Sequence, residues 1–115
     1  MEKSSQVEDR INRIIAQKGV DELIIVDPQE KIISHRLNPN LAAIIEKEKK
    51  QTEIYKKVKE ILDVAKYARI TIRELDPLND LTFLRIRSKN HEIMVSADNN
   101  YFLIVAQNPN EKDPE

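Results

Sequence analysis

Two histidines, His35 and His91, are the side chains best suited to proton transfer near neutral pH in this sequence. Neither has a second imidazole or a carboxylate at the spacing of a metal site. His35 is expected at a half-buried sheet edge and His91 in a turn. The serines lack a motif that would supply a general base; they lie at positions 4, 5, 34, 88 and 96. The sequence therefore predicts no enzyme and no metal site.

Glycine and cysteine counts exclude further classes of chemistry. Gly19 is the single glycine, so neither a GxxxxGK[ST] loop nor a GxGxxG turn can be present. Without cysteine there is no disulfide, thiolate nucleophile or thiolate metal ligand, which fits a reducing compartment. No cofactor is expected.

Two groups of charged residues could form a functional site, but each has a more common explanation or lacks a supporting feature. Asp76 and Asp80 flank Pro77 and could form a carboxylate pair, but such residues more often accept hydrogen bonds from local backbone N–H groups. A basic strip could form near the last third of the chain from Arg69, Arg73, Arg85, Arg87 and Lys89. Because no exposed aromatic residues alternate with it and the net charge is −1, nucleic acid is not an expected partner.

The chain length of 115 residues and the balance of 19 Lys and Arg against 20 Asp and Glu are typical of one small soluble domain. The longest apolar run, residues 101–106, is far shorter than the roughly 20 residues of a membrane-spanning helix. Residues 1–9 are too charged for a signal peptide. We expect a cytoplasmic domain over residues 1–109, no membrane partner, and a flexible acidic tail over residues 110–115.

Apolar side chains repeat at helical spacing near the N-terminus, at Val7, Ile11, Ile14 and Ile15. The pattern predicts a helix over about residues 6–18. Ser5 and Glu8 have the spacing of a capping box, Lys18 supplies a cation in the last turn, and Gly19 is expected to end the helix with a positive φ.

The next segments predict a hairpin and then a long helical region. Residues 23–26 are continuously apolar, as in a central strand, and a turn at 27–30 leads into an edge strand at 31–37. Residues 40–75 are rich in helix-forming residues, but their two apolar groups project about 130° apart, so one straight helix cannot bury both. The charged residues 46–53 between them could be a solvated spacer, a broken joint or a docking surface.

The last third predicts a three-stranded meander over residues 81–88, 91–97 and 101–106. The expected fold is α+β, with a five-stranded antiparallel sheet between helices in α/β/α layers. Residues 81–88 form a long strand without proline at the border of that sheet, and such an edge tends to pair with a second copy. Alternatively, Arg85 and Arg87 blunt the edge.

The sequence DPLNDLTFLRIRSKNHEIMV at residues 76–95, with YFLI at 101–104 and NP at 108–109, closely resembles the roadblock-type light chains of dynein motors. The likeness extends over about residues 66–109, and QKGV at 17–20 is also similar. It implies that the strand at 81–88 pairs across a dimer to give one sheet of ten strands. It further implies a non-catalytic protein that binds the dynein intermediate chain and is cytoskeleton-associated. The chain departs from the family by roughly a dozen extra residues around 40–52.

The resemblance implies two sets of site residues in a homodimer or a heterodimer with a paralogue. Dimer contacts are expected from Thr82, Leu84, Ile86 and Ser88 on the edge strand and from Ala65, Ala68 and Ile72 on the long helix. The partner-binding surface is expected to use Val7, Ile11, Ile14, Phe83 and Arg85. Since roadblock-like domains elsewhere serve small GTPases, a regulator or scaffold of a small GTPase is the alternative.

Overall fold

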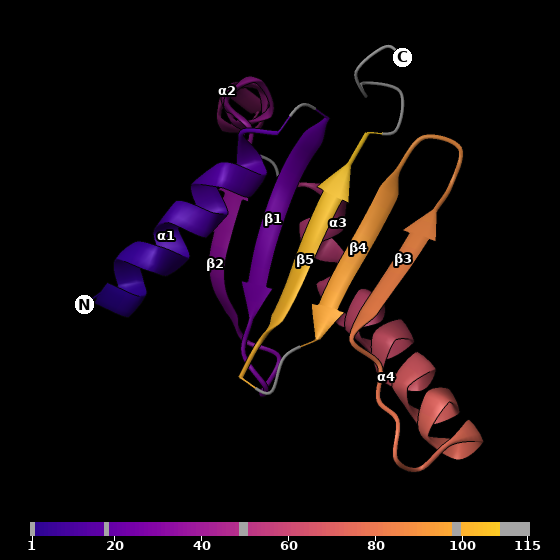
Figure 1. Cartoon of the computed structure of the whole chain (residues 1–115). Coiled ribbons are helices and arrows are strands. Elements are labelled where there is room, and N and C mark those ends of the chain that lie inside the picture. The colour runs from indigo at the N-terminus through magenta and orange to yellow at the C-terminus, as the bar shows by residue number, and fades with distance from the viewer. Residues whose placement is uncertain (1, 18, 49–50, 98–99, 109–115) are drawn as a thin grey trace, which may run out of the picture.

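The computed structural model describes residues 2–17, 19–48, 51–97 and 100–108 (Figure 1). The chain forms a helix, a hairpin, a helical region in three pieces and a meander. These elements are α1 (Glu2–Ile15), β1 (Val20–Val26), β2 (Ile32–Leu37), α2 (Pro39–Glu48), α3 (Glu53–Lys56), α4 (Val58–Leu75), β3 (Phe83–Arg87), β4 (Glu92–Ala97) and β5 (Phe102–Gln107). None of the described helices has the length and apolar content to cross a bilayer.

The five strands form one antiparallel sheet in the order β2-β1-β5-β4-β3. The two strands that contain continuous apolar runs, β1 and β5, adjoin each other in its middle, so β1 is central, as predicted. Leu23 and Ile24 are adjacent in β1, point to opposite faces, and are both fully buried. The expected α+β fold with a five-stranded sheet between helices is confirmed.

Helices cover the two faces of the sheet unequally. On one face, Leu62 and Ala65 of α4 pack against Ile24 and Ile104 of the central strands. On the other face, Ile11 of α1 packs with the side chains of β1 and β5. Figure 1 shows α1 lying over β1 and β2, while no described helix lies over the front of β4 and β3. We call this uncovered surface of β4 and β3, together with the neighbouring part of β5 on the α1 side, the open face.

The bounds of α1 differ from those predicted. The helix already begins at Glu2, so Ser5 lies inside it and the predicted capping box is wrong. Nothing before Ser5 breaks a helix, because Glu2 and Lys3 are good helix formers. At the other end the helix stops at Ile15, and Gly19 has the expected positive φ, 88°. Lys18 lies outside the described residues.

The turn between β1 and β2 forms as the Asp-Pro sequence predicts. The Asp27 side chain accepts hydrogen bonds from the backbone N–H groups of Gln29 and Lys31, both at 2.9 Å, and the Glu30 N–H donates to the Asp27 carbonyl. Glu30 adopts φ 69°, a value more common for glycine or asparagine. The turn aligns β2 on the free side of β1, where the predicted edge strand is found.

The helical region of residues 40–75 is broken, as its two separate apolar groups require. Asn38 caps α2 by accepting a hydrogen bond from the Leu41 N–H at 3.0 Å, with Pro39 in the first helical position. Thr52 caps α3 in the same way, accepting from the Tyr55 N–H at 3.0 Å. The joint between α2 and α3 includes residues 49–50, which lie outside the described residues.

Replacement of Gly19 tests the positive φ directly before β1, in the connection that follows α1. Gly19→Val should destabilise the protein by about 2 kcal/mol, because a left-handed conformation costs an ordinary L-residue ~1–2 kcal/mol and a β-branched residue more. Urea unfolding monitored by circular dichroism measures the loss.

Gly19→Asn is the matched control, since the asparagine side chain is close to valine in volume but tolerates a positive φ. It should lose clearly less stability than Gly19→Val. Equal losses in both variants would assign the effect to crowding at this buried position instead of to φ.

Candidate functional site

Strand β3 leaves one backbone edge of the sheet without a neighbour among the described residues. At one end of the strand the Ala97 N–H donates to the Thr82 carbonyl, and at the other the Ser88 N–H donates to the His91 carbonyl. Residues of an antiparallel strand alternate in bonding to either side. Because residues 82 and 88 bond towards β4, the backbone groups of residues 83, 85 and 87 point outward, away from the sheet.

The side chains of β3 alternate between the two faces of the sheet. Leu84 and Ile86 are half-buried, and Leu84 packs against the core beneath α4. Phe83, Arg85 and Arg87 are exposed on the open face. The predicted contact residues at either end of the strand, 82 and 88, are also exposed. Both a hydrogen-bonding edge and an apolar side-chain row are therefore available at this border.

Helix α4 exposes an unusual number of large apolar side chains close to that border. Tyr67 is 73 % exposed and Leu75 is 79 % exposed, Val64 and Ile70 are also exposed, and Leu78 is exposed in the loop that follows the helix. Exposed apolar surface of this kind often marks an interaction site.

The three helix residues expected at a dimer contact fall in different places. Ala65 is 2 % exposed and packs inside the core of its own subunit, so the expectation of a dimer contact there is wrong. Ala68 and Ile72 are partly exposed and remain candidates. Helical spacing groups residues on one side of a helix, but a broad stripe can face the sheet at its centre and solvent at its margin.

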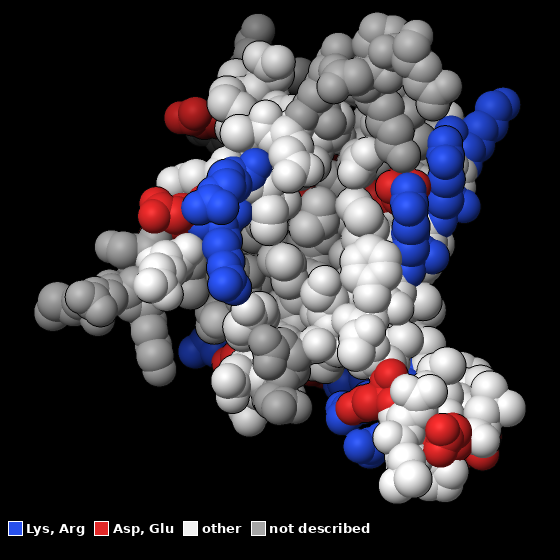
Figure 2. Space-filling model, in the orientation of Figure 1, with Lys and Arg blue, Asp and Glu red and all other residues white. Residues whose placement is uncertain are grey.

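A buried carboxylate supports the arginines of the open face. Glu92 of β4 is 1 % exposed, and Arg85 Nη2 donates to both of its carboxylate oxygens at 2.9 Å. Arg87 Nε lies 3.9 Å from Glu92 Oε2. Figure 2 shows blue side chains along this margin of the face with red atoms between them. Sequence reasoning missed Glu92, because its position in the strand does not reveal its burial.

A groove of about 840 Å³ lies on the same side of the sheet, next to α1. Ile11 and Ile14 line it from the helix and Leu103 lines it from β5. The partner residues predicted from the sequence thus share one side of the sheet without forming one patch, since Phe83 and Arg85 lie at its far border, on β3. Val7 lies outside the residues whose side chains the structure describes.

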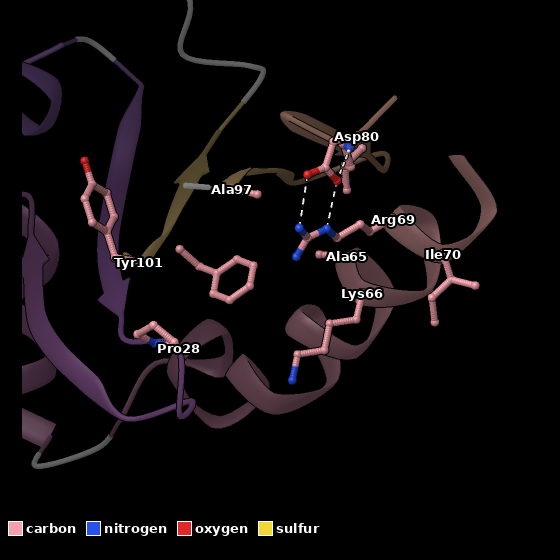
Figure 3. A pocket seen from close by; sticks show the side chains of 10 residues that line it. Pro28, Ala65, Lys66, Arg69, Ile70, Asp80, Ala97 and Tyr101 are labelled. Atoms are coloured by element: carbon pink, nitrogen blue, oxygen red, sulfur yellow. Dashed lines mark hydrogen bonds and ion pairs between the residues drawn. The ribbon is translucent and has the colours of Figure 1, made fainter. Parts of the chain in front are cut away.

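A second cavity, of about 460 Å³, lies between α4 and the loop that leads into β3 (Figure 3). Arg69 donates from Nε and Nη2 to the two carboxylate oxygens of Asp80, at 2.8 and 3.0 Å. This hydrogen bond is the main reason that the pKa of Asp80 is lowered, so the ion pair persists at neutral pH and is lost only as the pH falls through that lowered value. The side chains of Lys66 and Glu30 form another ion pair at the cavity.

These contacts assign local roles to several residues considered for chemistry. Asp76 accepts from the Leu78 N–H and Asp80 from the Leu81 N–H, as expected of aspartates in a turn. Arg69 and Arg73 pair with Asp80, whereas the arginines of β3 pair with Glu92, so the predicted basic strip is divided between two sites. The Arg69–Asp80 pair fastens the loop before β3 to α4.

A buried polar network joins β1, β2 and the start of α3. Glu22 is 2 % exposed, and its Oε2 lies 2.5 Å from both His35 Nε2 and Thr52 Oγ1. The His35 ring also packs on Tyr55, with ring centroids 4.7 Å apart. The threonine hydroxyl donates to the carboxylate and not to the imidazole, so this is not the arrangement of a nucleophile with its base. The network holds α3 against the sheet.

The remaining candidates for chemistry lie apart. His91 is exposed in the turn between β3 and β4. Within the described ranges, no three residues among His, Cys, Asp and Glu are placed to hold a metal ion together. The prominent features of this structure are therefore surfaces: the free β3 edge, the exposed side of α4 and the open face.

Comparison with known proteins relates the free edge to a known domain. Residues 61–108 match the Roadblock/LC7 domain. The resemblance to roadblock-type proteins is thus confirmed over a segment that runs from α4 through β5 and includes the free edge. Roadblock/LC7 domains are generally non-catalytic. The match begins after α1, β1, β2, α2 and α3, so the residues around 40–52 that were expected to be extra to the family lie outside it.

A solved structure described as "MglB with tetrameric arrangement" has the same fold. It matches with a TM-score of 0.70 over 93 % of this chain and 74 % of that chain, at 8 % sequence identity. The fold similarity therefore extends through the N-terminal half, which the Roadblock/LC7 match does not reach. Such low identity is evidence for the fold alone.

Thr52→Val tests the network at the start of α3. The variant loses the cap of α3 and one hydrogen bond to a buried carboxylate, so it should be destabilised by about 1–3 kcal/mol in urea unfolding. Thr52→Ser is the control, because it keeps the hydroxyl group and should lose much less. If Thr52→Val were as stable as Thr52→Ser, the hydroxyl would have no part in holding α3.

Proposed function

We propose that this chain is a non-catalytic dynein light chain that acts as a dimer, either with itself or with a paralogue. The β3 edges of two copies pair to make one continuous sheet, and the dimer binds a segment of the dynein intermediate chain. It serves as an accessory of microtubule-based transport and resides in the cytoplasm with the motor complex. The Roadblock/LC7 match supports the family on which this proposal is built.

The free edge of β3 is the observation that carries the dimer. A second β3 strand, antiparallel about a two-fold axis, gives hydrogen-bond partners to the outward backbone groups of both copies at once. The exposed apolar side chains of α4 lie on the helix that packs behind β3 and β4. Edge pairing therefore brings two such surfaces towards each other, and each large side chain buried there contributes about 1.5–3 kcal/mol. The tetrameric arrangement named for the MglB structure supports association between copies of this fold.

The open face suits the capture of a partner segment. Its sheet surface lacks a covering helix among the described residues, and an apolar groove lies beside α1 on the same side. An amphipathic segment can bury its apolar side on such a surface. Pairing two copies through β3 places their open faces next to each other, which makes a longer platform than one copy has.

Ile86→Asp tests the pairing of β3. Wild-type protein should be a dimer at micromolar concentration by size-exclusion chromatography with light scattering. Ile86→Asp should be monomeric, because a carboxylate on this half-buried row faces the apolar row of the second copy.

Ile33→Asp is the matched control, since Ile33 is an exposed residue of β2, at the opposite edge of the sheet. It should remain dimeric, and circular dichroism should show that both variants are folded. A monomeric wild-type protein, or a folded Ile86→Asp dimer, would contradict edge pairing through β3.

Purification from a native lysate tests the motor assignment. The tagged wild-type protein should recover a dynein intermediate chain, and the monomeric Ile86→Asp variant should recover much less. Recovery of a small GTPase without any intermediate chain would replace the motor role with regulation or scaffolding of that GTPase.

A further inference from the structure

We infer that the seam between two paired β3 strands is a binding site for carboxylate side chains, and that the partner segment is therefore an acidic amphipathic one. The inference rests on the proposed dimer, because one copy supplies only half of the site. It adds the chemical character of the partner and the residues that select it.

The outward backbone groups of β3 restrict how two copies can pair. Residues 83, 85 and 87 must bond across the seam, so a symmetric pairing that uses the whole of β3 (Phe83–Arg87) is centred on Arg85. Phe83 then lies opposite Arg87 of the second copy, and Leu84 lies opposite Ile86 on the α4 side. Arg85 of one copy lies opposite Arg85 of the other. The apolar pair and the arginine–aromatic pair are favourable, whereas the central pair brings two like charges together.

The charges at this seam do not cancel. Among the described residues, each copy contributes Arg85 and Arg87 and one carboxylate paired with them, the buried Glu92, so the dimer places four guanidinium groups over two carboxylates. Arg85 contacts Glu92 through Nη2 alone and its side chain is 50 % exposed, which leaves guanidinium donors directed to the open face. Glu92 fixes the arginines in place, and the excess positive charge is available to a ligand.

The surroundings of the seam favour a peptide over a nucleic acid. Phe83 is exposed beside the arginines, and Met94 and Leu103 are only partly buried on the same side of the sheet. Such a floor suits apolar side chains. At the groove beside α1 the balance is similar, with Arg10 and Arg36 against Glu8. Figure 2 shows blue side chains on both sides of a mostly uncharged surface. An apolar stripe flanked by carboxylates complements this pattern, whereas a uniformly charged polyanion has no apolar side to bury on the floor.

Binding and dimerisation should reinforce each other at this site. A carboxylate placed between the two Arg85 side chains offsets their repulsion, so it stabilises the dimer. By thermodynamic reciprocity, the dimer then binds the acidic segment more tightly than the monomer does. The repulsion also predicts that loss of the Arg85 charge strengthens the ligand-free dimer.

The experiment uses two synthetic helical peptides of about 18 residues, or five turns, with the same leucine stripe. One peptide carries glutamates on the flanks of the stripe and the other carries glutamines. Analytical ultracentrifugation of the full chain measures the dimer dissociation constant with each peptide. The glutamate peptide should lower this constant by about tenfold more than the glutamine peptide does.

Three variants locate the effect. Arg85→Gln should dimerise more tightly without peptide and should no longer distinguish the two peptides. Arg85→Lys keeps the charge and should retain part of the preference. Arg73→Gln removes an exposed arginine of α4 that pairs with Asp80 and is not on the open face, so this variant should keep the wild-type preference for the glutamate peptide.

The outcomes separate this inference from the proposed function. A wild-type monomer would refute the dimer and the seam together. A dimer that binds both peptides equally, or an Arg85→Gln dimer that still prefers the glutamate peptide, would overturn the seam site and leave the dimer standing. Tighter binding of a single-stranded oligonucleotide than of the glutamate peptide would also overturn it, in favour of a polyanion site.

Discussion

The outward row of backbone N–H and C=O groups on β3 is the constraint on which the interaction surfaces of this protein depend. Such a row is a template for another strand unless charge, proline or a covering segment blocks it. β3 contains no proline, and its two arginines are drawn onto the open face by Glu92. Their charge is thereby displaced from the backbone edge towards the sheet surface. No described strand lies beyond β3, so among the described residues the edge is accessible to a second strand.

Two buried carboxylates fix the geometry at opposite sides of the sheet. Glu22 joins two strands to α3 through His35 and Thr52, and Glu92 orients the arginines of β3. Burying a carboxylate is costly unless hydrogen bonds compensate it, so neither residue is expected to add much net stability. Their contribution is positional. Glu22 determines where the inserted segment lies, and Glu92 determines which way the positive charge of the border points.

The sequence predicted those parts of the fold that local patterns determine. A continuous apolar run identified the central strand β1, and the turn residues at 27–30 identified the hairpin. Features that depend on distant contacts were missed. The burial of Glu22 reflects partners 13 and 30 residues away, and that of Glu92 reflects arginines brought beside it by strand pairing. Ala65 was misplaced because helical periodicity does not say where the sheet ends and solvent begins.

Helix α2, which includes most of the residues expected to be extra to the family, lies far from the β3 border of the sheet. It begins at Pro39, directly after β2, and Figure 1 shows it beyond the ends of β1 and β2, whereas β3 forms the opposite edge. Thr52, at the end of the insertion, is fixed to Glu22 of β1 and not to the meander. The described residues of this segment therefore do not shield the free edge or the arginines of β3. Helix α2 lies nearer to α1 and β2, which line the apolar groove, than to β3. An effect of α2 on which partner binds is therefore expected at the groove and not at the β3 edge.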